Sequence, residues 1–308
     1  MASIPFTSLS ASSPRPHIEP ASLYSGSSSP GPVKLQIATG GAGESGLLRA
    51  LAEAFITSHI QSTGCSPFSI AWLKSDTAQS FNYLASGATD VSITYHPVAE
   101  EIAESQGFVG RREYGWRDHF MLVGPKSNPA HLPVIQKDSK ETTIDSLFSQ
   151  LFRAASSSTT NTIRFLSRYD KSATNIKESS IWTAIGQVPW AFPYSNWYHQ
   201  CVMFPRQALE AASRLGEYTL VDRGTWWAGE GWVRQEMSVF MEAGDSKDDV
   251  LLNPAHVLVC RYAENREMAE AFADWMVKED GGQKVARGFE VNGMVLYTPA
   301  PASGGKGS

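Results

Sequence analysis

Short apolar runs of strand character alternate along this chain with longer segments whose apolar residues recur at helical spacing. Residues 33–37 alternate between apolar and polar, which predicts a strand, and the apolar positions of 47–55 predict a helix. Further strands are predicted at 67–73, 91–94, 120–123, 163–166, 218–221, 239–242 and 256–262, and further helices at 75–85, 145–155, 172–185, 208–215 and 266–277. This alternation is typical of an α/β protein with a mostly parallel sheet.

Length and charge limit the classes of protein to consider. A chain of 308 residues, 42% of them hydrophobic, exceeds what a single core usually supports, so we expect two lobes. Charged residues make up 19%, and the formal net charge of −5 gives no reason to expect nucleic acid or a membrane surface as partner. Any anion site must therefore be built from local donors.

The three cysteines lie far apart in the sequence. Cys65, Cys201 and Cys260 form no CxxC pair and no cluster with histidine, so neither a zinc site nor a disulfide framework is indicated. We expect three buried thiols and no bound metal ion.

Both ends of the chain have the composition of disordered tails. Residues 1–32 are rich in Ser and Pro and lack the apolar core of a secretory signal, and 300–308 are rich in Gly and Ser. No run approaches the ~20 apolar residues that a membrane span needs. As it stands the sequence predicts a cytoplasmic protein, or a periplasmic or extracellular one if a signal was removed.

A glycine-rich segment follows the first predicted strand. Residues 41–46 read GxGxxG, the dinucleotide-binding pattern, but the acid expected ~20 residues further on has no better candidate than Asp76. An ATP phosphate loop is disfavoured, because Leu47 and Leu48 stand where Lys and Ser or Thr are required. Two interpretations remain open: an anion site at a helix N-terminus, with hydroxyls from Thr39 and Ser45, and a tight structural turn.

Six further segments carry a resemblance to a known family. They read GATDV at 87–91 with YHP at 95–97, GRRE at 110–113, DHFMLVGPKSNP at 118–129, FLSRYDKSAT at 165–174, YTLVDRGT at 218–225 and LNP at 252–254. In this order the segments resemble the tungstate-binding members of the type II periplasmic-binding-protein superfamily, the solute-binding components of ABC transporters.

The resemblance implies a fold and a mode of action. Two α/β lobes, 33–122 with 256–299 and 123–255, would be joined by crossover strands near 118–126 and 251–257. A small oxyanion, tungstate or molybdate first, would bind in the cleft between them by lobe closure, without catalysis and without a cofactor. A monomer is expected, and an ABC permease is the implied partner if the protein is exported.

The resemblance, together with the glycine segment, also places the ligand contacts. They are Thr39, Gly40, Gly41, Ser45, Arg168, Ser172, Thr174, Arg223 and Thr225. Arginine suits the task because its planar fork of donors matches the edges of an oxyanion. The alternative for Arg168 is a structural ion pair with Asp170 or Asp222, and for Arg223 an ion pair is favoured. Arg111 and Arg112 are expected to be solvated.

Two segments depart from the family pattern. The hydroxyl-rich first loop, TTTS in the family, is here Thr39 followed by GGA, and a glycine-rich donor loop has become HQCVMFP at 199–205. Aromatic residues gather around the second segment: Trp190, Phe192, Tyr194, Trp197, Tyr198, Trp226, Trp227 and Trp232. We expect them to pack in the core, although they could instead wall a site for a larger organic anion.

Three other functions remain open. One is an enzyme or sensor on the same fold that acts on a larger organic anion. Its acid and base groups would come from Glu44, His96, Asp118, His119, Asp170 and His199. The others are a dinucleotide-dependent oxidoreductase and a protein-interaction module.

Overall fold

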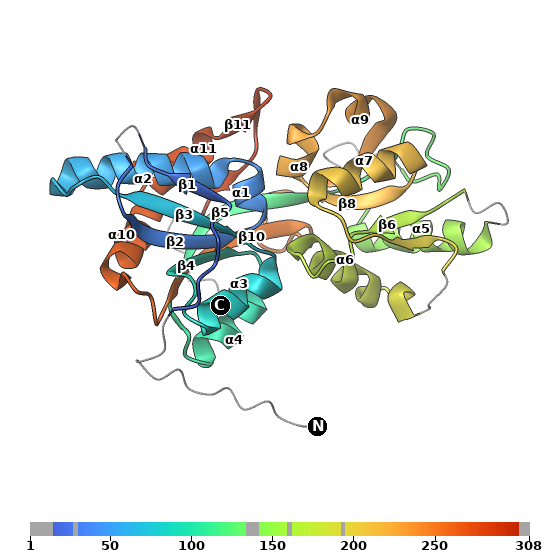
Figure 1. Cartoon of the computed structure of the whole chain (residues 1–308). Helices are drawn as coiled ribbons and strands as arrows, with labels where there is room; N and C mark the ends of the chain where they lie inside the picture. Colours follow the sequence, from blue (N-terminus) through green and yellow to red (C-terminus); the bar gives the residue numbers. More distant parts are fainter. Residues whose placement is uncertain (1–14, 27–29, 134–141, 159–161, 192–194, 302–308) are drawn as a thin grey trace.

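The computed structural model describes residues 15–26, 30–133, 142–158, 162–191 and 195–301. Figure 1 shows two α/β lobes side by side, with long strands running between them. The main sheet has the order β1-β3-β2-β4-β10-β5-β8-β6-β7, and β9 and β13 pair with β5 outside that path.

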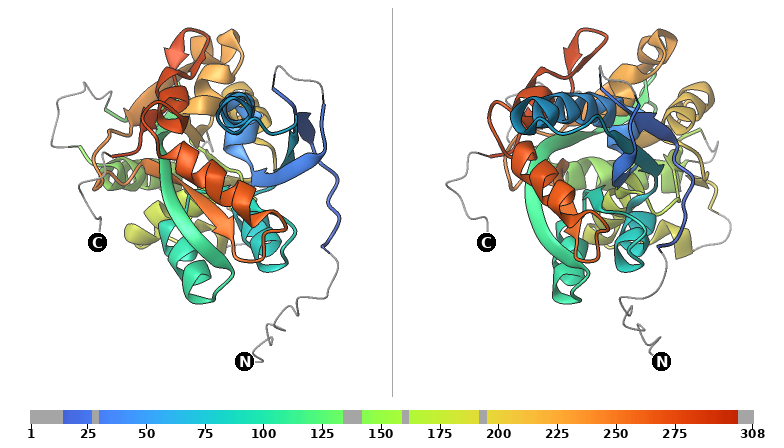
Figure 2. Two further views of the ribbon diagram at one scale, coloured as in Figure 1. Left: turned by 90° about the vertical axis from the view of Figure 1, so that its left-hand side faces the viewer. Right: turned by 60° about the vertical axis from the view of Figure 1, so that its left-hand side comes forward.

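The first lobe contains the N-terminal strands and the C-terminal helices. Its elements are β1 (Ser22–Tyr24), β2 (Val33–Thr39), β3 (Ser69–Lys74), β4 (Val91–Thr94), α1 (Gly41–Glu44), α2 (Leu47–Thr63), α3 (Thr77–Ala85), α4 (Pro97–Ser105), α10 (Arg266–Met276) and α11 (Gly282–Gly288). The apolar stripe of α2 is buried against α10, where the rings of Phe55 and Phe272 meet edge to face at 5.2 Å. Helices α3 and α4 pack in a separate cluster with β10, and Figure 2 shows them on the side of the sheet away from α2.

Two strands connect the lobes. Strand β5 (Val109–Pro125) pairs with β10 (Leu252–Cys260) as far as His119. From Phe120 onward it pairs with β8 (Tyr218–Asp222), and from Met121 onward with β9 (Met237–Glu242). A single strand thus contributes to the sheets of both lobes. The predicted lobe limits fall inside β5 and β10, and they stay a prediction.

The second lobe is built around an aromatic core. Its remaining elements are α5 (Ile144–Ser157), β6 (Phe165–Ser167), α6 (Ala173–Ala184), a 3-10 turn (Pro189–Ala191), β7 (Tyr198–Gln200), α7 (Pro205–Leu215), α8 (Arg223–Ala228) and α9 (Gly231–Glu236). Trp182 of α6 contacts Phe165 and Trp197 edge to face, with both ring-centroid distances at 5.3 Å. Three short strands close the chain in the first lobe: β11 (Glu290–Val291), β12 (Met294–Val295) and β13 (Thr298–Pro299).

The expectation of a mostly parallel sheet is wrong. Parallel pairing is limited to β2 with β3 and β4, and β6 with β7 and β8. The pairs that involve β5 or β10 are antiparallel. The physical reason is that β5 leaves the first lobe and β10 returns to it, so the two strands run side by side in opposite directions.

Part of the predicted N-terminal tail is ordered. Residues 22–24 form β1 against β3, and the side chain of Tyr24 is buried. Arg15 anchors the approach to this strand through Asp90 at 3.1 Å and Glu264 at 2.9 Å. Residues 1–14 and 302–308 lie outside the described residues.

The thiols also differ from expectation. Cys65, Cys201 and Cys260 form no disulfide, but only Cys260 is fully buried. The other two lie at half-buried positions, so the prediction of three buried thiols is wrong for them.

Candidate ligand-binding cleft

A cleft of about 600 Å³ lies between the lobes. The segments that follow β2 and β3 line it on one side, and those that follow β6 and β7 line it on the other. The lining residues include 40–41, 74–77, 172–174 and 202–205, with Asp118, Phe120 and Asn253 of the connecting strands. Parallel strands end together at one edge of a sheet, which is where ligands of open α/β proteins bind.

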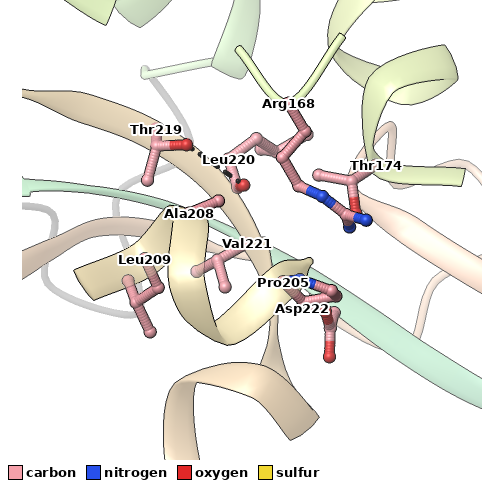
Figure 3. Close-up of a pocket in the computed structure, with 9 residues that line it drawn as sticks. All are labelled: Arg168, Thr174, Pro205, Ala208, Leu209, Thr219, Leu220, Val221 and Asp222. Carbon is pink, nitrogen blue, oxygen red and sulfur yellow. Dashed lines mark hydrogen bonds between the residues drawn. The ribbon is translucent and has the colours of Figure 1, made fainter. Parts of the chain in front are cut away.

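Arg168 directly follows β6 and is 9% exposed. Its Nη2 forms an ion pair with Asp170, its Nη1 donates to Thr174 Oγ1 at 3.2 Å, and its Nε donates to the Met203 carbonyl at 3.3 Å. The ion-pair alternative with Asp170 is therefore present, while Arg168 still lines the cleft. Figure 3 shows its side chain beside Thr174, next to a small cavity of about 10 Å³ that Arg168 lines together with residues of α7 and β8.

Ser172 and Thr174 lie where α6 begins. Ser172 caps the helix by accepting from the Asn175 amide, and its own amide donates to Asp170 Oδ1 at 3.1 Å. Both residues line the cleft beside Arg168. A guanidinium, two hydroxyls and the first turn of a 12-residue helix thus come together, as the predicted contacts require.

The first-lobe loop brings backbone rather than hydroxyls to the cleft. Gly40 and Gly41 line it. Thr39 is fully buried, and its Oγ1 has no hydrogen-bond partner. Ser45 Oγ accepts from the Tyr297 hydroxyl at 2.8 Å. Neither Thr39 nor Ser45 is among the residues that line the cleft, which disfavours their predicted roles.

The glycines of this loop satisfy packing and turn geometry. Gly43 lies against the ring of Trp72, where an added Cβ would come within 2.2 Å of ring carbons. Gly46 has a φ of 89°, which favours glycine. Asp76 accepts from the Gln79 amide at 2.7 Å and caps α3. These contacts favour the structural turn over a dinucleotide fingerprint.

Arg223 and Thr225 hold the second lobe together instead of lining the cleft. Arg223 pairs with Glu242 at 2.6 Å, the ion pair that was favoured for it. Thr225 donates its hydroxyl to Asp222 Oδ2 at 2.6 Å. Their placement among the ligand contacts is therefore disfavoured.

Arg111 and Arg112 belong to ion-pair clusters of the first lobe. Arg111 contacts Asp274 and Glu113, each at 2.7 Å, and Arg112 contacts Glu104 at 3.3 Å. The expectation that they are merely solvated is wrong.

Sequence reasoning missed two residues that meet across the cleft. Lys74, at the end of β3, forms an ion pair with Glu44, and its Nζ lies 3.9 Å from the ring centroid of Phe204. All three residues line the cleft. Because Lys74 belongs to the first lobe and Phe204 to the second, this cation–π contact joins the two walls.

The cleft also contains a buried acid on β5. Asp118 accepts from the His119 amide at 2.7 Å and from Asn253 Nδ2 at 3.1 Å. Burial, reinforced by the nearby carboxylate of Asp222, raises the pKa of Asp118 to about 8. Burial therefore favours the neutral form of its carboxyl.

The histidines proposed for an enzyme lie outside the cleft lining. His199 pairs with Glu217 at 2.9 Å, His119 with Asp245 at 2.8 Å, and His96 Nδ1 accepts from the Ala99 amide at 3.1 Å as a helix cap. None is among the residues that line the cleft. Of the other acid and base candidates, Glu44, Asp118 and Asp170 do line it.

The aromatic residues of the second lobe pack mostly as expected. Trp190, Trp197 and Tyr198 join the cluster around Trp182, and Trp226, Trp227 and Trp232 pack around α7. Phe192 and Tyr194 lie outside the described residues. None of the described six lines the cleft, so core packing accounts for them.

Two kinds of feature are absent from the described residues. They contain no group of three or more His, Cys, Asp or Glu side chains arranged to hold a metal ion. Among the helices formed by those residues, none has the length and apolar character needed to cross a bilayer.

The chain matches known proteins over most of its length. The PBP superfamily domain covers residues 26–280. A "Putative ABC transporter anion-binding protein" of Haloferax volcanii is 30% identical over 220 residues, which are 69% of this chain and 58% of that protein. The chain thus spans little more than half the length of this relative.

Two solved structures resemble the protein. A "periplasmic putative metal binding protein" is 49% identical, covers 91% of this chain and 99% of its own, and superposes with a TM-score of 0.82. The tungstate-binding protein TupA of Desulfovibrio alaskensis is 23% identical, covers 88% of this chain and 99% of its own, and has a TM-score of 0.68. The chain therefore belongs to the PBP superfamily and has the two-lobed type II periplasmic-binding fold that its motifs predicted.

Proposed function

We propose that this chain is a solute-binding protein that holds a small oxyanion between its lobes, without catalysis, with tungstate and molybdate as the first ligands to test. The observation that carries the proposal is Arg168, a nearly buried guanidinium in the cleft wall beside the hydroxyls of Ser172 and Thr174. A fixed cation with uncharged donors around it suits a dehydrated dianion. The names of the anion-binding and tungstate-binding relatives support the same ligand class.

Five acidic residues also line the cleft, and each has a partner or a structural role. Asp170 pairs with Arg168, Glu44 pairs with Lys74, and Asp76 caps α3. Asp222 accepts from the amide and the hydroxyl of Thr225, at 2.8 Å and 2.6 Å. Burial raises the pKa of Asp118 to about 8, which favours its neutral form. An entering oxyanion would therefore meet few uncompensated carboxylates.

Lobe closure would complete the site. The two connecting strands allow the walls to approach each other, and the Lys74–Phe204 contact already bridges them at 3.9 Å. The coordinating groups of the two lobes would then share one ligand. No protein cofactor is needed for this action, since the oxyanion itself is the ligand.

Delivery to an ABC permease is part of the proposal. The Haloferax volcanii relative is named as an ABC transporter protein, and other relatives are named as tungstate-binding proteins. The same role would place this protein outside the cytoplasmic membrane and would suit a monomer. Co-purification with a permease from membranes of the source cell, increased by the ligand, would support this part.

Calorimetry tests which ligand the protein binds. Purified protein is titrated with tungstate, molybdate, sulfate and phosphate, and with Mn²⁺ and Zn²⁺ because of the acidic lining residues. Micromolar or tighter binding of an oxyanion, lost in Arg168→Ala, supports the proposal. Binding of a divalent cation alone, or of no oxyanion below millimolar Kd, would overturn it.

A further inference from the structure

We propose that the cleft contains an apolar subsite next to Arg168, formed by Val202, Met203 and Phe204, which admits the organic part of a ligand. The preferred ligands would then be small organic oxyanions, such as aryl or alkyl phosphates and carboxylates. This inference rests on the proposed function for the anionic group and adds the class of molecule that carries it.

The apolar subsite lies directly beside the anion contact Arg168. Arg168 Nε donates to the carbonyl of Met203 at 3.3 Å, so the segment before α7 is attached directly to the guanidinium. The same segment places Val202, Met203 and Phe204 along the cleft. A ligand whose charged group binds Arg168 would therefore have its remaining atoms beside these apolar side chains.

These side chains are unusually open to solvent. Phe204 is 56% exposed and Val202 is 72% exposed, although both line a cleft. Single exposed apolar residues are common on protein surfaces, whereas contiguous exposed apolar patches mark ligand or partner surfaces. An apolar ligand group would remove this area from water and gain binding free energy in proportion.

Apolar groups also line the cleft from the other elements. Phe120 of β5 and Ile93 of β4 reach it with side chains that are only 1% and 2% exposed, and Tyr95 directly follows β4 in the first lobe. Lys74 covers the Phe204 ring from the same lobe at 3.9 Å and holds this wall in place. An inorganic oxyanion gains nothing from such a lining, because each of its oxygens needs a donor.

The size of the cleft agrees with this chemistry. A volume of about 600 Å³ corresponds to about 20 water molecules at ~30 Å³ each. A four-oxygen oxyanion fills only a small part of that space. Sites for organic ligands span roughly 300–1,000 Å³ and combine apolar walls with a few polar groups, which is the arrangement found here.

Matched ligand pairs test the subsite. The full chain is titrated calorimetrically with phosphate and phenyl phosphate, with acetate and phenylacetate, and with tungstate. The phenyl member of each pair should bind about tenfold more tightly, since burial of a ring of this size gains at least that factor. Equal affinities within both pairs would overturn the inference.

Substitutions then identify the residues that provide the added affinity for the phenyl group. Phe204→Ala should reduce the ratio of phenyl phosphate to phosphate affinity severalfold, and Val202→Ser should reduce it less. Val188→Ala, at a 46% exposed position outside the cleft lining, should leave both affinities unchanged. An unchanged ratio in Phe204→Ala would place the ring-binding surface elsewhere and overturn the assignment.

The two proposals fail in different ways. Binding of tungstate or phosphate with no gain from the phenyl group would overturn the apolar subsite and leave the proposed function standing. Failure of all five anions to bind would overturn both. Arg168→Ala separates the contributions further, because it should abolish binding of both members of a pair, whereas Phe204→Ala should change the ratio of their affinities.

Discussion

Arg168 and Asp170, two residues apart in the loop after β6, form an ion pair in the wall of the cleft. Both side chains are largely buried, and Asp170 also accepts from the Ser172 amide at 3.1 Å. The guanidinium is thus held in place by the carboxylate that an incoming anion must compete with. The ion pair with Asp170 therefore both orients the guanidinium and competes with the ligand for it.

Asp170→Asn should therefore raise the affinity for oxyanions. The amide keeps an oxygen for the Ser172 N–H but removes the negative charge beside Arg168. We expect about a tenfold gain, because charged hydrogen bonds contribute roughly 1.5–3 kcal/mol and part of the competition remains. Calorimetry with tungstate or molybdate measures it, and a lower affinity than wild type would show that Asp170 helps to bind the ligand.

Arg168→Ala should abolish oxyanion binding. Removal of the guanidinium also leaves Asp170 without its cation, which should cost about 1–3 kcal/mol of unfolding free energy. The double variant with Asp170→Asn should recover most of that stability and still not bind. Urea unfolding and calorimetry on both variants separate the two effects, and binding retained by the folded double variant would contradict the site.

Gly41 and Gly43, two positions apart, make a matched test of the first-lobe loop. Gly43→Ala should destabilise the protein by roughly 1–3 kcal/mol, because the new Cβ would come within 2.2 Å of the Trp72 ring. Gly41→Ala should fold normally, since no heavy atom lies within 4 Å of its Cβ position. Thermal melts of the two variants measure the difference. Equal stability would mean that the loop is not packed as described.

Gly41→Ala also examines the dinucleotide alternative. Gly41 lines the cleft, so an added methyl group should weaken binding of an anion that contacts the loop backbone. NADH fluorescence should show no binding to wild type. Saturable NADH binding that Gly41→Ala removes would revive the alternative and contradict the structural role of the glycines.

The sequence predicted the fold better than the fine structure of the site. Local periodicity is sufficient to locate α2 or α10, and ordered motifs were sufficient to identify the two-lobed family. The position of Arg168 in the cleft wall could be predicted from its motif, because a residue that directly follows a strand lies at the edge of the sheet. The antiparallel course of β5 and β10 was missed, since the pairing of residues more than 100 positions apart leaves no local pattern.

Side-chain direction explains why some predicted contact residues do not line the cleft. Thr39 and Ser45 have the expected residue types at the expected loop, yet their hydroxyls are buried or bonded to Tyr297. Lys74 carries no motif and reaches the cleft only because β3 ends beside the glycine loop. The directions of these side chains depend on tertiary packing, which cannot be predicted from composition or from residue spacing.

The buried acid Asp118 should make stability depend on pH in a direction that can be worked out. Its pKa is raised from the ordinary carboxyl value near 4 to about 8 by burial and by Asp222. Between these values the native state holds a proton that the unfolded state has lost. The contribution of this group to stability is therefore complete below about pH 4, falls as pH rises, and is lost above about pH 8.

Asp118→Asn should remove that contribution to the pH dependence. The unfolding free energy of the variant minus that of wild type should therefore increase as the pH rises from 5 to 9. Taking this difference cancels titrating groups that do not interact with Asp118, including Glu178, whose pKa burial also raises to about 8. Oxyanion affinity of wild type should fall above pH 8, where Asp118 becomes negative in the cleft, and the variant should resist that fall. Parallel pH profiles for the two proteins would mean that Asp118 is already ionised at neutral pH, and that the cleft tolerates its charge.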